Sequence, residues 1–190
     1  NTDIVLKIWD EQTIDEVSYL LSITTYLSEN NVPTPTPIPF SNGELLIVKD
    51  GKAWTLLPFI EGSWLEPNIN SLYSLGRVQA SLHLVKPPVH MKETYSMGYS
   101  LFEKLFLIAD EKNEWSDFMV MLKSETTTLK QNIGILPKGI IHGDLFPDNI
   151  LTSNNNINTI LDFEEVCFDI LAFDLVLSLI HISEPTRQFR

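Results

Sequence analysis

The chain has 190 residues, of which 44% are apolar and 20% charged, ordinary values for a globular protein. Its net charge of −12 argues against binding to a nucleic-acid backbone, which needs a basic surface. The closest approach to a membrane span, residues 170–182, is too short and is interrupted by Asp174. The single Cys167 cannot form an internal disulfide, and residues 1–9 lack the pattern of a signal peptide. These features predict a cytoplasmic protein with one large domain or two small lobes.

The front of the chain predicts a strand followed by a helix. Residues 3–9 (DIVLKIW) alternate as a strand does, but no turn or partner strand precedes them, so we expect a sequence truncated at its front edge. Residues 13–29 predict a helix whose apolar side chains share one face. Thr13 and Glu16 have the spacing of a capping box at its N-terminus.

A proline at every second position from 33 to 39 predicts an extended connector after this helix. Two strand-like runs follow, residues 45–49 and 53–59, and the Asp-Gly dipeptide between them is typical of a tight β-hairpin. Residues 58–62 (PFIEG) then predict a hinge.

The remainder of the chain predicts mainly helices with short strands between them. The helices are expected at residues 68–85, 99–109 and 115–132, and the strands at 139–141, 150–152 and 157–161. A strand-rich front and a helical back define an α+β chain in two lobes, residues 1–61 and 62–181. Residues 182–190 lose all periodicity, so we expect a disordered or foreign tail there and a truncation at the back as well.

The segment from 140 to 151 (IIHGDLFPDNIL) carries polar residues between two apolar strands. Asn149 follows Asp144 by five residues, and Asp162 ends another apolar run 18 residues after Asp144. Phosphoryl transfer needs a carboxylate to accept the proton of the attacking hydroxyl and a hard cation to neutralise phosphate oxygens. Mg²⁺ prefers oxygen ligands, commonly one or two carboxylates together with substrate phosphates. These three residues therefore predict a phosphoryl-transfer site.

The same segment resembles the catalytic loop of aminoglycoside phosphotransferase-like kinases, which carry H-G-D-x-x-x-x-N where protein kinases carry H-R-D-x-x-x-x-N. The resemblance implies a protein-kinase-like two-lobed fold that uses ATP and Mg²⁺. It implies that Asp144 is the catalytic base and that Asn149 and Asp162 are the metal ligands. Asp162 is followed by Phe163-Glu164 instead of Phe-Gly, which suits a small-molecule kinase and argues against protein-kinase activity.

The resemblance also implies a nucleotide-binding side. Lys7 resembles the strand lysine that grips the α- and β-phosphates, and Pro58, Phe59 and Ile60 resemble the linker whose backbone meets adenine. Glu16 is either the ion-pair partner of Lys7 or only the third residue of the capping box. The glycine-rich strand pair that covers the triphosphate in the family does not precede Lys7, which puts the activity of this polypeptide in question.

Two further residues are expected to support the loop. His142 either touches substrate or braces the loop by donating to a backbone carbonyl, and we favour the brace. Asp174 stands in an apolar helix, where an unpaired charge is costly, so it must be paired or hydrogen-bonded. In the family the matching aspartate braces the catalytic loop through backbone hydrogen bonds.

Motifs along nearly the whole chain resemble the homoserine kinase branch of the family, among them NVPTP, LPFIEG and ILDFEEVC. The resemblance implies an ATP-dependent homoserine kinase of threonine biosynthesis, with a small-molecule alcohol as substrate. Two alternatives stay open. One is a kinase for an aminoglycoside or choline-like alcohol, whose pocket Glu164, Glu165 and Asp169 could serve. The other is an inactive, truncated kinase that acts as a binding module. The sequence leaves the oligomeric state open.

Overall fold

In the computed structural model, which describes residues 3–183, the first three strands form an antiparallel sheet in the order β1-β3-β2. The strands are β1 (Ile4–Trp9), β2 (Leu46–Lys49) and β3 (Lys52–Pro58). Asp50 and Gly51 join β2 to β3 with φ angles of 52° and 75°, the left-handed backbone that a two-residue hairpin requires at both positions. The predicted hairpin is confirmed.

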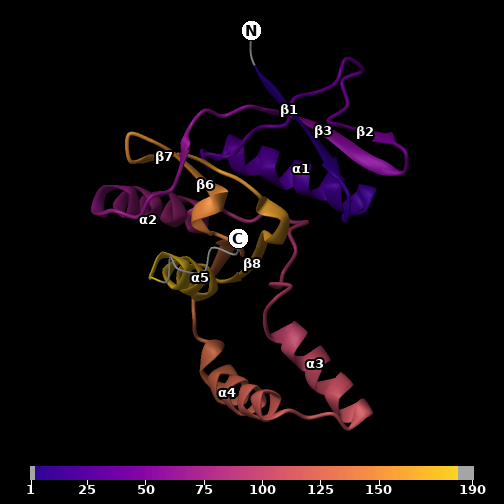
Figure 1. Ribbon diagram of the computed structural model, residues 1–190, viewed down its shortest axis with the longest axis vertical. Coiled ribbons are helices and arrows are strands. Elements are labelled where there is room, and N and C mark those ends of the chain that lie inside the picture. The colour runs from indigo at the N-terminus through magenta and orange to yellow at the C-terminus, as the bar shows by residue number, and fades with distance from the viewer. Residues whose placement is uncertain (1–2, 184–190) are drawn as a thin grey trace.

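Helix α1 (Ile14–Glu29) lies beneath this sheet (Figure 1). The Thr13 hydroxyl accepts the N–H of Glu16, and the Glu16 carboxylate accepts the N–H of Thr13 at 2.8 Å, so the predicted capping box is confirmed. One face of the helix is buried through Val17, Leu20, Leu21, Ile23 and Leu27. Burial of this face stabilises the helix more than its intrinsic propensity does.

A second antiparallel sheet has the order β4-β6-β7 and consists of β4 (Ser63–Trp64), β6 (Ile150–Ser153) and β7 (Asn156–Ile160). Asn154 and Asn155 make the β6–β7 turn with φ angles of 52° and 62°, as the Asn-rich sequence predicts. Helix α2 (Ile69–Leu84) packs against β7, and its N-cap is Asn68, whose side chain accepts the N–H groups of Asn70 and Ser71.

The proline-rich connector after α1 joins the two sheets. The N–H of Ile38 donates to the Leu56 carbonyl of β3 at 2.8 Å, and the Pro33 carbonyl accepts the N–H of Ile160 of β7 at 2.7 Å. The connector is therefore hydrogen-bonded to both sheets, which fixes the relative position of β3 and β7.

A third, two-stranded sheet pairs β5 (Lys138–Ile141) with β8 (Cys167–Ile170) and leads into helix α5 (Leu171–Ser183). Two short 3-10 helices, η1 (Pro147–Asn149) and η2 (Phe163–Glu165), lie in the loops between these strands. Because α5 runs to Ser183, the first two residues of the segment expected as a tail are helical. Residues 184–190 lie outside the described residues.

Helices α3 (Tyr99–Lys112) and α4 (Asp117–Ile133) form a pair that extends away from the rest of the molecule (Figure 1). Phe106 of α3 stacks on Trp115, with 5.8 Å between the ring centroids, and the Lys123 ammonium lies 4.5 Å from the Trp115 centroid. The pair thus has its own small aromatic cluster. The Trp115 side chain precedes α4, which begins two residues later than predicted.

One buried apolar cluster connects α1, α2 and all three sheets; it includes Val17, Leu27, Ala53, Leu82, Ile140 and Ile160. The fold is α+β, with small antiparallel sheets and a mainly helical second part, as the sequence predicts. Among residues 3–183, no helix combines the length and the apolar character needed to span a bilayer.

Candidate active site

The loop that follows β5 is fixed by Asp174, in the first turn of α5. The Asp174 side chain is fully buried, and its carboxylate accepts the backbone N–H groups of His142 at 3.0 Å and Gly143 at 2.9 Å. His83 of α2 supplies a third partner, with Nε2 at 3.0 Å. Burial by itself would raise the pKa of Asp174, but the hydrogen bonds from His83, Gly143 and His142 lower it, so the carboxylate stays ionised.

Gly143 bends this loop with a φ angle of 83°. A Cβ at this position would come within 2.8 Å of the Glu165 carbonyl oxygen and within 3.0 Å of the Tyr95 ring. Both the backbone conformation and the lack of space therefore require glycine between His142 and Asp144.

His142 is fully buried and connects the loop to the end of β7. Its Nδ1 accepts the N–H of Asp144 at 3.2 Å, so the other ring nitrogen carries the proton and donates to the Leu161 carbonyl at 2.8 Å. Burial lowers the pKa of His142, which favours the neutral ring. These are contacts of a brace, and the buried ring offers no surface to a substrate.

Asp144 lies beside Asn149, the last residue of η1. The amide nitrogen of Asn149 donates to the Asp144 carboxylate at 3.1 Å and to the Asp144 carbonyl at 2.8 Å. These bonds use the nitrogen of the amide and leave its oxygen for other partners. Burial raises the pKa of Asp144, and the hydrogen bond from Asn149 offsets this only in part. A raised pKa makes the Asp144 carboxylate a stronger proton acceptor.

Asp162, between β7 and η2, has the left-handed backbone angles φ 59° and ψ 64°. A residue with a Cβ adopts this conformation at a cost, and such residues gather at functional sites. Its carboxylate Oδ1 lies 3.7 Å from the Lys7 Nζ, and its side chain is 43% exposed.

Lys7 points from β1 toward Asp162 and toward Glu164 of η2. The distance from Lys7 Nζ to the Glu164 carboxylate is 2.8 Å, and Gln12 donates to the other oxygen of that carboxylate. The Lys7 ammonium also lies 3.8 Å from the ring centroid of Trp9. Lys7 therefore faces the Asp162 side of the cavity.

Glu16 does not belong to this cluster. Within residues 3–183, the carboxylates recorded as ion-pair partners of Lys7 are Asp162 and Glu164, whereas the Glu16 carboxylate is exposed and bonds to Thr13. The two hydrogen bonds from Thr13 lower the pKa of Glu16. Of the two interpretations left open, the structure supports the capping box.

A cavity of about 560 Å³ lies between the first sheet, α1 and the loops after β5 and β7. Its lining contains most of the residues that the sequence singles out: Lys7, Pro58, Phe59, Ile60, Asn149 and Asp162. Apolar side chains of β1, α1 and β3 form much of the rest of the wall. Asp144 adjoins the cavity through its hydrogen bond with Asn149.

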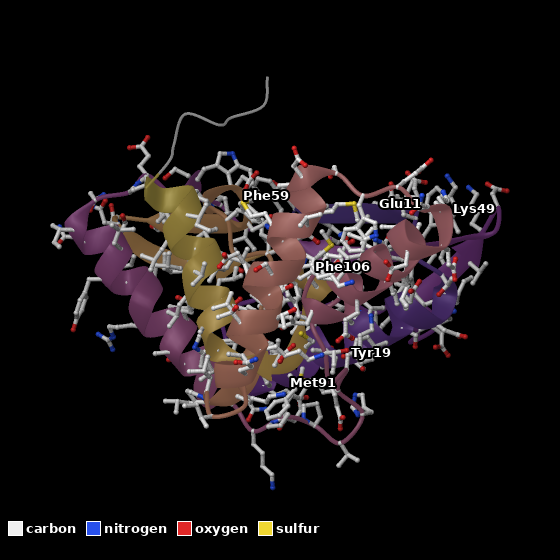
Figure 2. The ribbon with its side chains drawn as sticks, turned by 90° about the horizontal axis from the view of Figure 1, so that it is seen from below. Glu11, Tyr19, Lys49, Phe59, Met91 and Phe106 are labelled. Carbon is white, nitrogen blue, oxygen red and sulfur yellow. The ribbon has the colours of Figure 1, made fainter. Side chains whose placement is uncertain are left out.

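The proposed linker residues differ in what their backbone can offer. The N–H of Phe59 is already donated to the Asp3 carbonyl at 3.0 Å, and Pro58 has no N–H. The Phe59 side chain is half-exposed and is labelled in Figure 2. Of these three residues, Ile60 is therefore the one whose N–H could donate to a ligand at this edge of the cavity.

Sequence reasoning missed two residues of the site, Glu164 as the partner of Lys7 and His83 as a partner of Asp174. Both contacts join positions far apart in the chain, 157 and 91 residues respectively. The only local signal was that a buried Asp174 needs a partner, and it does not say which residue provides it.

The donor atoms beside the cavity fit a magnesium ion. Asp162 offers a carboxylate and Asn149 an amide oxygen, and no three His, Cys, Asp or Glu side chains converge in a metal-binding arrangement anywhere in residues 3–183. A metal ion here would take its remaining ligands from water and from a bound phosphate, which is how Mg²⁺ binds in nucleotide-dependent enzymes.

The fold is that of protein-kinase-like phosphotransferases. Residues 1–190 match the sequence profile of the phosphotransferase enzyme family, and the chain belongs to that family. Homoserine kinase of Rhodopseudomonas palustris (strain TIE-1) is 27% identical over 184 residues, which cover 92% of this chain and 55% of the relative. The chain spans about half the length of the curated relatives it matches.

Solved structures support the same fold. A choline/ethanolamine kinase family protein from Mesorhizobium loti superposes with a TM-score of 0.73 at 13% identity, over 95% of this chain and 59% of that one. The aminoglycoside phosphotransferase APH(3'')-Id from Streptomyces rimosus, solved with ADP and streptomycin, gives 0.71 at 15% identity, over 96% and 72%. At these identities the likeness concerns the fold.

Proposed function

We propose that this protein transfers the γ-phosphate of ATP to the hydroxyl group of a small molecule, and that the preferred substrate is homoserine. The observation that carries the proposal is the convergence on one cavity of Lys7, Asn149 and Asp162, with Asp144 hydrogen-bonded to Asn149 beside it. Membership in a phosphotransferase family supports the reaction class.

Asp144 is the proposed catalytic base. In the transfer step the substrate hydroxyl oxygen forms a bond to the γ-phosphorus while the bond to the departing ADP oxygen breaks, and Asp144 accepts the hydroxyl proton. The N–H groups of His142 and Gly143 donate to Asp174 and hold the loop, and Asn149 donates to the Asp144 carboxylate, so this carboxylate is oriented before substrate arrives.

Lys7 is the proposed ligand of the α- and β-phosphates. Its ammonium pairs with the carboxylates of Asp162 and Glu164, and the phosphate oxygens of a bound triphosphate would take the place of these carboxylates as its partners. Asn149 and Asp162 are the proposed Mg²⁺ ligands; the ion would neutralise phosphate oxygens as negative charge develops on them.

The cavity wall around residues 58–60 is the proposed adenine edge, and its apolar side chains suit a flat heterocycle. In this proposal residues 1–61 form the nucleotide-binding lobe with its hinge, and residues 62–181 form the catalytic lobe. Residues 182–190 lie outside both.

Homoserine is proposed because the curated relatives reported above carry the name homoserine kinase. A second candidate, an aminoglycoside or choline-like alcohol, rests on the structural neighbours and on the acidic residues Glu164, Glu165 and Asp169 near the catalytic loop. Acidic groups of this kind suit a cationic substrate.

The test is a coupled assay of ADP release by the full-length protein with ATP and Mg²⁺, over a panel of homoserine, choline, ethanolamine and several aminoglycosides. Homoserine-dependent ADP release, with a product whose mass has increased by one phosphate, is the expected result. Preferential turnover of a panel member other than homoserine would replace the substrate. The absence of ADP release with every alcohol, in a protein that binds ATP, would favour the binding-module alternative.

A further inference from the structure

The segment between α2 and α3 is hydrogen-bonded to α1, to β8 and to the catalytic loop. We call residues 91–98 the strap. The N–H of Lys92 donates to the Tyr19 hydroxyl of α1 at 3.0 Å, and the Lys92 carbonyl accepts the N–H of Phe168 at 2.7 Å. Figure 2 shows Tyr19 and Met91 at this end of the strap. The strap thus connects α1 to β8, the strand paired with β5.

The central residue of the strap is Tyr95, which is buried. Its N–H donates to the Asp169 carboxylate at 3.0 Å, and its hydroxyl donates to the Gly143 carbonyl at 2.7 Å. Its ring lies against Phe173 of α5, with 6.0 Å between the ring centroids. Burial raises the pKa of Tyr95 to about 12, so the hydroxyl keeps its proton and remains a donor at neutral pH.

The Gly143 carbonyl is half of the peptide group that leads directly into Asp144. The other half, the N–H of Asp144, donates to Nδ1 of His142 at 3.2 Å. Both polar groups of this one peptide are therefore engaged, the carbonyl by Tyr95 and the N–H by His142. Because a peptide group is planar, fixing both ends fixes its rotation and with it the direction in which the Asp144 side chain leaves the backbone.

We propose that Tyr95 is a positioning residue for phosphoryl transfer, whose hydroxyl orients the Gly143–Asp144 peptide and thereby aims the Asp144 carboxylate at the substrate hydroxyl. This inference rests on the proposed function, in which Asp144 is the base. Asp174 binds the preceding N–H groups of the loop and leaves this carbonyl to Tyr95, so the two residues fix different parts of the loop.

Tyr95→Phe removes the hydroxyl and keeps the ring, and Tyr26→Phe is the matched control. Tyr26 also donates its hydroxyl to a backbone carbonyl, that of Lys86 at 2.8 Å, but it lies outside the lining of the cavity and outside the catalytic loop. Both variants are made in the full-length protein, alone and together with Asp144→Asn. Turnover is expressed per nucleotide-binding site, so that a partly unfolded sample does not count as a slow enzyme.

Tyr95→Phe should lower kcat roughly tenfold, because small misplacements of a reacting group are costly to the rate. The KM for ATP should stay within about twofold of the wild-type value. In the Asp144→Asn background the same change should alter the residual rate by less than about twofold, because the group it orients is already absent. Tyr26→Phe should change neither value.

The outcomes separate this inference from the proposed function. If Asp144→Asn lowers turnover but Tyr95→Phe behaves as Tyr26→Phe does, the role of Tyr95 is refuted and the base assignment stands. If Tyr95→Phe is equally harmful with and without Asp144, it acts independently of Asp144 and the inference is wrong. If Asp144→Asn turns over normally, the base assignment fails, and the role of Tyr95 fails with it.

Discussion

The side chain of Asp144 has the surroundings that a proton acceptor in phosphoryl transfer needs. It is partly buried, which raises its pKa, and one amide group, that of Asn149, orients it. A fully exposed carboxylate would be a weaker base, and a carboxylate paired with a cation would be weaker still.

The first prediction concerns this residue. Asp144→Asn retains the shape of the side chain and removes its basicity, so kcat should fall by about 10²–10⁴ while nucleotide affinity is unchanged. In the wild type, kcat should also decline as the pH falls through the raised pKa of Asp144, and this decline should be missing from the residual activity of the variant. Steady-state assays between pH 4 and pH 8, with nucleotide titrations alongside, measure both effects.

Sequence spacing alone predicts Asp144, Asn149 and Asp162 as site residues, because they lie at fixed distances from apolar strands that can be recognised locally. It could not select Glu164 as the partner of Lys7 or Tyr95 as the partner of Gly143. Those contacts depend on how β1 and the strap pack on the catalytic loop, and packing of distant segments leaves no periodic signal.

At the scale of elements, mutation can distinguish two roles for Glu16 at the N-terminus of α1: a residue of the capping box or the ion-pair partner of Lys7. Glu16→Ala breaks the capping box and should lower the melting temperature, but it should leave nucleotide affinity within about twofold. Lys7→Ala should instead weaken nucleotide binding by about tenfold or more, because it removes a charge-assisted contact with phosphate. Thermal melts and nucleotide titrations of both variants make the comparison. A tenfold loss of affinity in Glu16→Ala would restore Glu16 to the nucleotide site.

A second prediction at this scale concerns the attachment of α5 to the catalytic loop. Asp174→Asn places an amide where the N–H groups of His142 and Gly143 point, and should cost about 1–3 kcal/mol of folding free energy at neutral pH. The folded pKa of Asp174 is lowered, so its contribution is complete above the unfolded pKa near the ordinary value of 3.8 and is lost as the pH falls through the folded pKa.

Urea denaturation at pH 7, 5, 4 and 3 checks this prediction. The stability difference between wild type and Asp174→Asn should be constant from pH 7 to about pH 5 and should shrink at lower pH. A difference that grows toward acid pH contradicts the assignment of Asp174 as an ionised brace.

Elements whose caps or turns have recognisable sequence motifs were predicted well, whereas the short strands β4 and β8 were not predicted. Four or five neighbouring residues are enough to specify the caps of α1 and α2. The same holds for the β2–β3 turn at Asp50 and the β6–β7 turn at Asn154. Strand β4 has only two residues, and β8 (Cys167–Ile170) contains Asp169 and lacks alternation. Both exist because β6 and β5 provide hydrogen-bonding partners, and that pairing becomes visible only in the folded chain.

On the scale of the whole molecule, the cavity is shared between segments at the two ends of the described chain. Lys7 comes from β1 and Asp162 from the loop after β7, so a molecule bound to both links the first sheet to the catalytic loop. A non-hydrolysable ATP analogue at about 100 times its Kd should therefore stabilise the protein by about 2.7 kcal/mol.

This stabilisation should depend on Mg²⁺ in the wild type and should lose that dependence in Asp162→Ala. Asn149→Ala should weaken the dependence without abolishing it, since the charged carboxylate of Asp162, the stronger ligand for Mg²⁺, remains. Calorimetric melts with and without Mg²⁺ measure this stabilisation in Asp162→Ala and Asn149→Ala. Tyr26→Phe is the control and should show the magnesium dependence of the wild type. Equal magnesium dependence in wild type and Asp162→Ala would remove Asp162 from the metal site.

The strand-rich front and helical back were predictable because the hydrophobic period changes from two residues to nearly four along the chain. The direction in which α3 and α4 leave the body was not predictable. Their contacts are mostly with each other, so nothing in their own sequence specifies the angle seen in Figure 1.

The contact between Lys7 and Trp9 has an optical consequence. An indole whose face lies 3.8 Å from an ammonium group emits in a strongly polarised environment, and Trp9 lines the cavity together with Trp64. Trp54 and Trp115 lie outside that lining, and Trp115 is stacked within the α3–α4 pair. When a phosphate draws Lys7 away from the indole, the emission of Trp9 should change in intensity and wavelength. Under the proposed function, Trp9 would therefore serve as an intrinsic fluorescent probe of nucleotide binding, and Trp9→Phe identifies its share of the signal.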